Sequence, residues 1–342
     1  MATDAGSASR LQHLIRLEDL RDEQLEDLLD LAARLKARPG RGDLGARSVG
    51  LLFFRPSLRT RISFEAAMHQ LGGHAIDLSA TSDFWQLEDR EGRVMDGRAP
   101  EHIKDAAAVL SRYVDALAVR PAAEGNAWNV DRKDSQIAAW ARYATVPVIN
   151  MESALWHPLQ ALADVLTLRE RLGSLPGRRL ALVWVASQQP ASVAVAHSVL
   201  LAALRQGMEV RLAHPPGFEL DETVLEAARR TARERGTRLV ETGDREAAVD
   251  GAEIVYARSW KSLEHYGNET LEASHRARFH GWKIDEALLA RGADARLMHA
   301  MPIRRNLEVT DEVLDGPRSL VYDQAENRLH AQKALLRLLL RA

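Results

Sequence analysis

The sequence predicts an α/β protein with two lobes, each built on a parallel β-sheet. Short apolar runs alternate with amphipathic segments along the chain, and this alternation is typical of strands joined by helical crossovers. The alternation pauses at the turn-forming sequence Gly-Ser-Leu-Pro-Gly at 173–177 and then starts again. The chain has 342 residues, which is too long for one ordinary core and fits two domains of about 150 residues.

The first lobe is expected to open with a helix and to continue with strands and helices in turn. Leucines at helical spacing predict a helix over 17–37, and the apolar run 49–54 ends abruptly at Arg55-Pro56, as a buried strand does where it meets a loop. The stretch 79–100 is polar and has few periodic apolar positions. Further strands are expected at 75–78, 116–119 and 147–150, and further helices at 60–71, 136–143 and 157–172.

The second lobe is expected to repeat this pattern. Its strands are expected at 180–185, 209–213, 238–241 and 253–256, and its helices at 193–205 and 223–235. The amphipathic segment 326–340 predicts a last helix that packs back on the first lobe. We therefore expect one domain at 1–155, completed by the C-terminal helix 324–342, and a second domain at 156–323.

Composition argues against several classes of protein. The 46 basic and 48 acidic residues give a formal net charge of −2, so no overall field attracts nucleic acid or a membrane. Cysteine is absent, which excludes disulfides, a thiolate zinc site and a thiol nucleophile. The opening residues have no hydrophobic signal core, and no apolar run approaches the ~18 residues of a membrane span. We expect a cytoplasmic protein that has neither nucleic acid nor a membrane as partner.

The segment that follows the first strand has the composition of an anion-binding site. Ser57 and Thr60 offer hydroxyl groups, and the first turn of the next helix offers backbone N–H groups and the positive end of the helix dipole. Arg59 and Arg61 carry planar guanidinium groups that match phosphate oxygens. The same residues could form an ordinary helix cap with two solvated arginines, so the segment alone leaves both interpretations open.

Two further features favour the anion site. Arg120 ends another predicted strand, and His157 and Gln160 follow a third, three residues apart and so on one side of a helix start. Ligands of open α/β sheets bind beyond the carboxyl ends of the strands. The sequence therefore places an imidazole, a carboxamide and several cationic or hydroxyl groups at such ends.

These residues resemble four motifs of the aspartate and ornithine transcarbamylase family, in the family's order. The motifs are Ser-Leu-Arg-Thr-Arg at 57–61, His-Pro-Leu-Gln at 157–160, His-Ala-Met-Pro at 299–302 and Ala-Glu-Asn-Arg at 325–328. The resemblance implies two Rossmann-like lobes linked by helices. It also implies a carbamoyltransferase, which moves the carbamoyl group of carbamoyl phosphate onto the primary amine of an amino acid.

Within the family, the chain is most similar to the N-acetylornithine and N-succinylornithine carbamoyltransferases. In that branch the counterpart of Trp85 reaches the neighbouring subunit's site, so the resemblance implies a homotrimer with shared active sites, and it also implies a shallow trefoil knot in the second lobe. Pro100 stands where succinyl-preferring relatives carry proline and acetyl-preferring ones carry glutamate, which favours a succinyl group. Besides Trp85, the similarity rests on 94–97, 150–152, 257–260 and 304–306.

The resemblance also implies roles for individual residues. Carbamoyl phosphate would be bound by Ser57, Leu58, Arg59, Thr60, Trp85, Arg120, His157, Gln160 and Arg328. Catalysis would rest on Arg59, His157, Gln160 and Arg328. The acceptor would be bound by Pro100, Glu152, Arg258, His299, Ala300, Met301 and Arg304. No metal or redox cofactor is expected. No protein general base is expected either, because the departing phosphate can take the proton of the attacking amine. Arg61 would be a supporting residue.

Three departures from the family pattern fall in the acceptor half. Ala300-Met301 replaces the usual Cys-Leu, the sequence Ser-Gln-Gln-Pro at 187–190 replaces His-Pro-x-Pro, and Arg258 replaces a lysine. The donor motifs show no such change. We therefore expect N-succinyl- or N-acetyl-L-ornithine as acceptor, with a shorter diamino acid such as 2,3-diaminopropionate as the alternative.

Other classes fit the sequence less well. A non-catalytic paralogue that only binds an anion would not need the complete set of donor residues. A dinucleotide-binding dehydrogenase would need a Gly-x-Gly-x-x-Gly sequence after a first strand, and none is present there. Aspartate is not the acceptor that we expect, because residues 304–306 and 325–328 are similar to those of the ornithine branch of the family.

Overall fold

The structure is a computed structural model that describes residues 11–38 and 44–340. The chain divides into two compact units. The first unit comprises the residues up to Pro121, Ser135–Met151 and the residues from Gln332 on. The second unit comprises Ala122–Asp134 and Glu152–Ala331.

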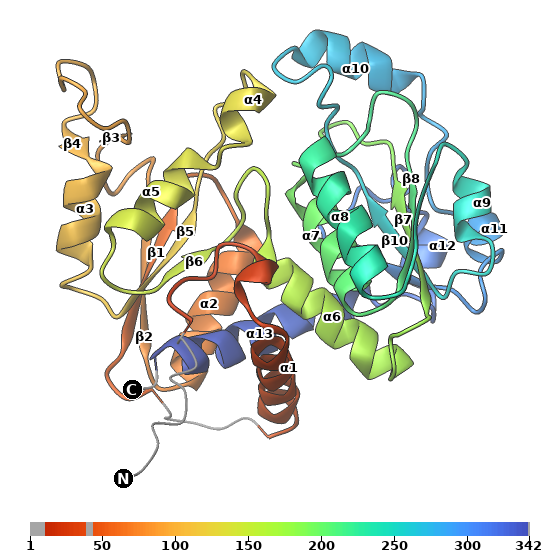
Figure 1. Ribbon diagram of the computed structural model, residues 1–342, viewed down its shortest axis with the longest axis horizontal. Coiled ribbons are helices and arrows are strands. Elements are labelled where there is room, and N and C mark those ends of the chain that lie inside the picture. The colour runs from red at the N-terminus through yellow and green to blue at the C-terminus, as the bar shows by residue number, and fades with distance from the viewer. Residues whose placement is uncertain (1–10, 39–43, 341–342) are drawn as a thin grey trace. The chain divides into compact units, whose positions relative to one another are not determined.

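The first unit contains a four-stranded parallel sheet in the order β2-β1-β5-β6 (Figure 1). Its central strands are almost wholly buried, as parallel strands covered on both faces are, and this is why they appear in the sequence as short unbroken apolar runs. All four strands lie where apolar runs predicted them. They are β1 (Ser48–Phe53), β2 (His74–Ser79), β5 (Ala116–Arg120) and β6 (Val148–Asn150).

Helices pack against this sheet. α3 (Ile103–Leu110) and α5 (Ser135–Tyr143) enclose a core with it, to which Leu117, Ile137 and Trp140 contribute. α2 (Leu58–Gln70) packs against β1 and β2. α1 (Asp22–Ala37) buries its leucine face, and α13 (Val321–Leu340) contributes its residues from Gln332 on to this unit.

The single helix predicted over 17–37 is wrong at its start. A short 3-10 helix at Leu17–Asp19 comes first, and α1 begins only at Asp22. Arg21 lies between them with an extended backbone, and its N–H donates to Gln24 Oε1 at 3.0 Å. This side-chain cap satisfies a donor that a continuous helix would have bonded internally, so the helix restarts there.

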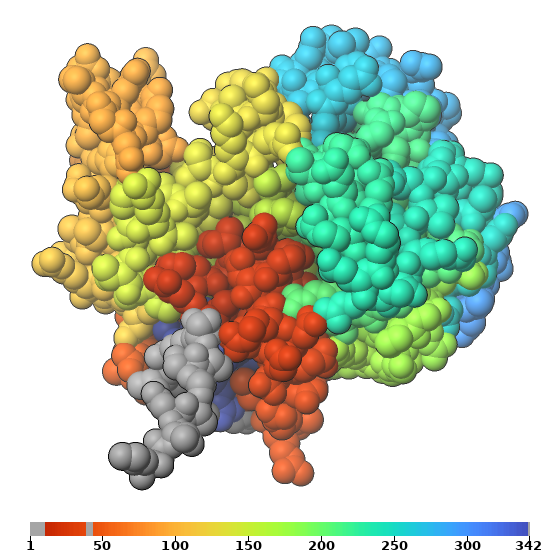
Figure 2. Space-filling model, viewed as in Figure 1, coloured from red at the N-terminus to blue at the C-terminus, as the bar shows by residue number. Residues whose placement is uncertain are grey.

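The polar stretch 79–100 has more structure than its periodicity predicts. It contains β3 (Leu87–Glu88), which pairs with β4 (Glu101–His102), and it leads into α3. The orange part of the space-filling view, around β3 and β4, stands out from the rest of the first unit (Figure 2). Trp85 and Val94 on this projecting segment are 71% and 76% exposed.

The second unit contains a five-stranded parallel sheet in the order β11-β10-β7-β8-β9. The parallel α/β class predicted from the sequence is therefore confirmed, whereas the knot stays a prediction. The strands are β7 (Arg179–Trp184), β8 (Glu209–Ala213), β9 (Leu239–Thr242), β10 (Ile254–Arg258) and β11 (Arg296–Met298). The larger helices are α6 (Pro158–Leu172), α7 (Ala194–Arg205), α8 (Glu222–Glu234) and α10 (Glu269–Ala277). The shorter ones are α4 (Trp128–Asp131), α9 (Arg245–Val249), α11 (Glu286–Leu289) and α12 (Asp311–Leu314).

Each sheet has one point where the strand order changes direction. In the first unit the chain runs from β1 outward to β2 and from β5 outward to β6, so the change lies between β1 and β5. In the second unit it lies between β7 and β10. The loops that leave such neighbouring strands diverge, and the crevice between them is where open α/β sheets bind ligands.

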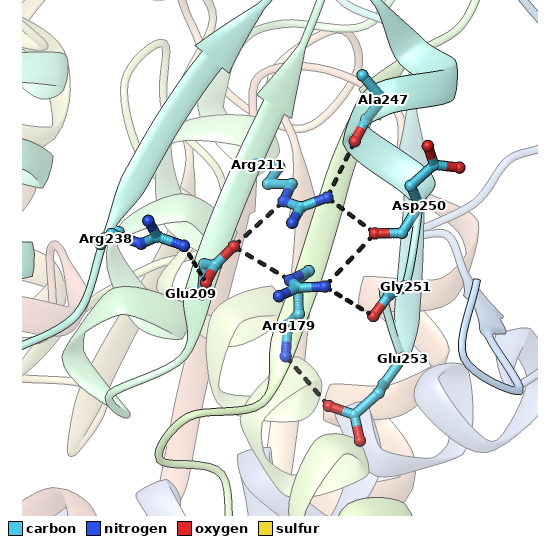
Figure 3. A network of polar contacts seen from close by, with 8 residues as sticks. All are labelled: Arg179, Glu209, Arg211, Arg238, Ala247, Asp250, Gly251 and Glu253. Carbon is cyan, nitrogen blue, oxygen red and sulfur yellow. Dashed lines mark hydrogen bonds and ion pairs between the residues drawn. The ribbon is translucent and has the colours of Figure 1, made fainter. Parts of the chain in front are cut away.

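The opposite edge of the second sheet is closed by charged side chains (Figure 3). Glu209 Oε1 accepts from Arg179 Nε and from Arg211 Nε, both at 3.1 Å, and Glu209 Oε2 accepts from Arg238 Nη2 at 3.0 Å. Arg211 also donates to the carbonyl oxygens of Ala247 and Asp250. This network holds the N-terminal ends of neighbouring strands together, away from the edge at which the strands end.

Over the residues that the structure describes, no helix is both long enough and apolar enough to cross a membrane.

Candidate active site

The predicted anion cradle lies at the change of strand order in the first unit. Ser57 caps α2 with an extended backbone, and its side chain makes no capping hydrogen bond. The cap hydroxyl and the N–H groups of the first helical turn are thus directed to the same helix end. Thr60 is buried, Arg59 is half-buried, and Leu58 is 73% exposed, so Leu58 offers its backbone rather than its side chain.

Arg120 lies at the same sheet edge as the cradle. It pairs in register with Phe53, the last residue of β1, and its carbonyl accepts from Phe54 N at 3.0 Å. Arg55 Nε donates to the carbonyl of Pro121 at 3.0 Å, which fastens the cradle loop to the segment that follows Arg120. The structure therefore places Ser57, Arg59 and Thr60, which follow β1, at the same sheet edge as Arg120, which ends β5.

Arg61 points elsewhere. It forms an ion pair with Asp77 on β2, and its guanidinium lies over the Phe53 ring, 4.2 Å from the ring centroid. This is the supporting role expected of it. Trp85 and Pro100 belong to the projecting segment rather than to the edge that carries the cradle, and both are exposed.

His157 and Glu152 form a pair in the second unit. His157 caps α6, with Pro158 in the first helical position, and its backbone N–H donates to Ser198 Oγ at 2.8 Å. The His157 Nε2 atom lies 3.9 Å from Glu152 Oε2, and Ser192 Oγ donates to Glu152 Oε1 at 3.1 Å. Glu152 was expected to bind the acceptor, and in the structure it lies beside the His157 imidazole.

Gln160 and Arg328 meet although 168 residues separate them in the chain. Arg328 Nη1 donates to Gln160 Oε1 at 2.9 Å, and both side chains are buried. Gln160 Nε2 donates in turn to Asp164 Oδ1 at 2.8 Å. Burial raises the pKa of the Asp164 carboxyl to about 6, although hydrogen bonds from its neighbours oppose the rise.

The residues expected to bind the acceptor include a cluster at the ends of β10 and β11. Arg258 ends β10, is buried, and directs Nη1 toward the Met301 carbonyl at 3.5 Å. His299 Nδ1 accepts from Met301 N at 2.8 Å. Met301 has a φ of 54°, in the left-handed region that non-glycine residues seldom adopt, so the backbone at Ala300-Met301 is held in a strained turn.

Arg304 and Glu308 complete this cluster. Arg304 Nη2 donates to Gln189 Oε1 at 2.9 Å, so Arg304 is not merely a solvated side chain. His299 Nε2 lies 3.2 Å from Glu308 Oε2, and both side chains are buried. Burial raises the pKa of Glu308, but the interaction with His299 outweighs it, and the pKa falls below its usual value.

Sequence reasoning missed four buried residues of these clusters: Asp164, Tyr256, Gln324 and Glu308. Asp164 carries a signal in hindsight, because it lies one helical turn after Gln160 in a segment that is otherwise mostly apolar. Gln324 and Tyr256 carry none, since only the fold brings them to Asp164.

The described residues contain no group of three or more His, Cys, Asp or Glu side chains arranged to hold a metal ion. The candidate site residues offer hydrogen-bond donors and positive charge instead. The first unit offers hydroxyl, N–H and guanidinium groups that match a phosphate. The second offers an imidazole, a carboxamide and a guanidinium that can stabilise negative charge developing on a carbonyl oxygen.

Comparison with known proteins gives the same picture along the whole chain. Residues 12–170 match the family described as aspartate/ornithine carbamoyltransferase, carbamoyl-P binding domain. Residues 179–339 match the family described as aspartate/ornithine carbamoyltransferase, Asp/Orn binding domain. The N-acetylornithine carbamoyltransferase of Xanthomonas campestris pv. campestris is 40% identical over 329 residues, which cover 95% of this chain and 97% of that protein. The ornithine carbamoyltransferase of Parafrankia sp. is 43% identical over 335 residues, or 96% of each chain.

Solved structures agree with these sequence relatives. A crystal structure of acetylornithine transcarbamylase complexed with acetylcitrulline has a TM-score of 0.95 and 40% identity, and the match covers 97% of this chain and all of the other. A mutant N-acetyl-L-ornithine transcarbamylase complexed with carbamyl phosphate and N-succinyl-L-norvaline has a TM-score of 0.94 and 41% identity, over 96% of this chain and all of the other. Because the similarity extends over both domains, the chain belongs to the aspartate/ornithine carbamoyltransferase family and is a carbamoyltransferase.

Proposed function

We propose that this enzyme transfers the carbamoyl group of carbamoyl phosphate to the side-chain amine of an N-acyl-L-ornithine, giving the N-acyl-citrulline and phosphate. The observation that carries the proposal is the cradle of Ser57, Arg59 and Thr60 beside Arg120 at the change of strand order in the first sheet. A phosphate held there meets positive charge and oriented donors from two neighbouring strands.

The first unit would act as the carbamoyl-phosphate-binding domain. Arg59 and Arg120 neutralise the phosphate while Ser57 and Thr60 donate hydrogen bonds, and together they stabilise the phosphate as it leaves. The departing phosphate can accept the proton of the attacking amine. A protein general base is therefore unnecessary, and positioning supplies much of the remaining rate.

In the second unit, His157, Gln160 and Arg328 would polarise the carbamoyl carbonyl. The hydrogen bond between Arg328 and Gln160 supports this assignment, since it joins two of the three groups in a buried, low-dielectric setting where donors act strongly. The oxyanion that forms on amine attack would be stabilised by this set.

The second unit would also bind the acceptor. Glu152, Arg258 and Arg304 offer charged groups for its α-amino substituent and carboxylate, while the backbone around Ala300 and Met301, held by His299, would orient the amine. Pro100 supports a succinyl group on the acceptor, and the relatives that act on N-acetylornithine support an acetyl group. Both acyl groups therefore belong in the test.

We further propose a cytoplasmic homotrimer in which Trp85 of one subunit completes the site of the next. The exposure of Trp85 and Val94 on the projecting segment supports this, because a monomer gains nothing by keeping large apolar side chains in water.

The test measures phosphate release from carbamoyl phosphate against a panel of amines, with the ureido product confirmed by mass. The panel holds N-succinyl-L-ornithine, N-acetyl-L-ornithine, L-ornithine, 2,3-diaminopropionate, lysine and aspartate. We expect acceptor-dependent release with an N-acyl-ornithine as the best substrate. Release with none of the panel, from a protein that binds carbamoyl phosphate, would contradict the proposal and support a non-catalytic paralogue.

A further inference from the structure

One buried carboxylate joins the segments that carry the second unit's candidate site residues. Asp164 lies on α6 and is 1% exposed. Its Oδ1 atom accepts from Gln160 Nε2 at 2.8 Å and from Gln324 Nε2 at 2.7 Å. Its Oδ2 atom accepts from the Tyr256 hydroxyl at 3.0 Å.

These bonds fix which way the two glutamine amides face. A carboxamide can turn over and exchange its oxygen and nitrogen, and only its partners decide between the two orientations. Because both Nε2 atoms are tied to Asp164 Oδ1, both Oε1 atoms point away from it. Gln160 Oε1 then accepts from Arg328 Nη1 at 2.9 Å, and Gln324 Oε1 accepts from His299 N at 2.8 Å.

The network connects three elements and the turn that follows β11. Asp164 and Gln160 belong to α6, Gln324 and Arg328 to α13, and Tyr256 to β10, two residues before Arg258 (Figure 1). The hydrogen bonds from His299 N through Gln324 to Asp164 therefore tie the turn at the end of β11 to the middle of α6. Asp164 Oδ1 is therefore bonded both to a residue expected to face the carbamoyl group, Gln160, and to Gln324, which holds the turn expected to face the amine.

Packing alone does not account for a carboxylate at this position. Burying an ionised group is costly unless hydrogen bonds compensate it, and an apolar side chain of similar volume would fill the space without that cost. Three hydrogen-bond donors converge on Asp164. A carboxylate can accept all three bonds, whereas a leucine would leave the donors without an acceptor.

We propose that Asp164 is a positioning residue for carbamoyl transfer. Its Oδ1 atom fixes the amide orientation of Gln160 and Gln324, and so holds Arg328 and the His299 turn in their productive places. This inference rests on the proposed function, because Asp164 would position residues that carry out carbamoyl transfer.

Two variants separate this role from space filling. Asp164→Asn keeps an oxygen at the Oδ1 position for both glutamines, and its amide can donate to the Tyr256 oxygen. Asp164→Leu has a similar volume but removes the acceptor. We expect Asp164→Leu to lower kcat about 10²-fold, as misplacement of reacting groups by about 1 Å does, while Asp164→Asn keeps most of the activity.

A matched control lies one turn further along the same two helices. Thr167 Oγ1 accepts from Asn327 Nδ2 at 2.9 Å and donates to the Ala163 carbonyl at 2.7 Å, and neither partner is a candidate site residue. Both Thr167 and Asn327 are buried. Thr167→Val should lower the melting temperature and leave kcat unchanged. A loss of kcat in Asp164→Leu but not in Thr167→Val supports positioning rather than general loosening of the helix pair.

The outcome that overturns the inference is a folded Asp164→Leu enzyme with wild-type kcat, or equal losses in the Leu and Asn variants. If Asp164→Leu does not fold, Gln324→Met decides, because it removes the links from Gln324 to His299 N and to Asp164 Oδ1 and leaves the bond between Asp164 and Gln160 in place. A folded Gln324→Met enzyme with reduced kcat supports the inference, and one with unchanged kcat contradicts it. Carbamoyl transfer by the wild-type protein is measured first, so that failure of the proposed function is distinguished from failure of the role of Asp164.

Discussion

At the scale of single residues, the candidate phosphate cradle combines groups from two neighbouring segments of the chain. The guanidinium of Arg59 stands at a helix start beside Ser57 and Thr60, and Arg120 reaches the same edge from the neighbouring strand. The motif spacing predicts that these residues share one sheet edge, because each lies at or after the end of a recognisable strand. The partners of Gln160 were not predictable in the same way, since Asp164 and Gln324 meet only in the folded chain.

Arg59→Ala should abolish most of the turnover without loss of the fold. Removing one donor of transition-state charge stabilisation costs about 10²-fold or more in kcat. Steady-state kinetics and circular dichroism of the variant give the two readouts. Arg34→Ala, an exposed arginine on α1, is the matched control and should keep wild-type kinetics. A folded Arg59→Ala enzyme that retains more than about a tenth of the rate would remove Arg59 from the cradle.

The raised pKa of Asp164 predicts how stability changes with pH. Its folded pKa of about 6 lies above the usual value of 3.8, so the folded state binds a proton that the unfolded chain releases. This contribution to stability is complete below pH 3.8 and is lost as the pH rises through about 6. Between pH 3.8 and pH 6, the free energy of unfolding of the wild-type protein should therefore fall by about 3 kcal/mol relative to that of Asp164→Leu.

Denaturant unfolding of both proteins from pH 4 to pH 7 measures this difference. Because each unfolding free energy is compared at the same pH, groups common to both proteins cancel. A difference that stays constant, or that grows in favour of the wild-type protein as the pH rises, would show that Asp164 is not held with a raised pKa.

At the scale of elements, strands and long helices were predictable, whereas short elements were not. The central strands β1, β5, β7 and β10 are buried apolar runs that local sequence is enough to predict, whereas the three-residue strand β11 was not predicted. β3, β4 and α4 are too short to show a period, and the extended backbone at Arg21 arises from a side-chain cap rather than from glycine or proline. The edge network around Glu209 was also hidden, because its arginines come from three separate strands or strand starts (Figure 3).

Glu209→Gln should destabilise the second unit without affecting the ligand edge. The substitution removes the charge that three arginines share, and hydrogen bonds to charged groups are worth about 2 kcal/mol. Burial raises the pKa of Glu209, but the arginines outweigh it and the folded pKa lies below the usual 4.5. Its stabilising effect is therefore present above pH 4.5 and is lost as the pH falls through the folded pKa.

Thermal unfolding at pH 7 and at pH 3.5 checks this prediction. The gap in melting temperature between wild type and Glu209→Gln should be wide at pH 7 and narrow at pH 3.5. Glu226→Gln, an exposed change on α8, should show little gap at either pH. A Glu209→Gln enzyme as stable as the wild type at pH 7 would mean that the network contributes nothing measurable.

At the scale of the whole molecule, the proposed trimer makes a prediction that a monomer does not. If Trp85 completes the neighbouring subunit's site, each site contains Arg59 from one subunit and Trp85 from another. Trp85→Ala and Arg59→Ala then affect residues that different subunits contribute to one site. Each variant alone should have lowered activity. Mixing the two under conditions of subunit exchange should restore part of the activity, because some hybrid sites then contain both intact residues.

Restored activity is measured after exchange has been verified by mass spectrometry of differently tagged subunits. Mixed wild-type and Arg59→Ala subunits provide the reference for random assembly. If verified hybrids regain no activity, Trp85 and Arg59 act in the site of the same subunit. That result would contradict shared sites.

The central claim is that the carbamoyl group passes from carbamoyl phosphate to an N-acyl-ornithine. The most direct test is carbon-13 NMR of the enzyme with carbonyl-labelled carbamoyl phosphate and N-succinyl- or N-acetyl-L-ornithine. The account predicts that the label moves from the carbamoyl phosphate signal to a ureido signal of the N-acyl-citrulline, in step with phosphate release. Label that stays in carbamoyl phosphate with both acceptors, but enters the ureido product of a shorter diamino acid such as 2,3-diaminopropionate, would contradict it.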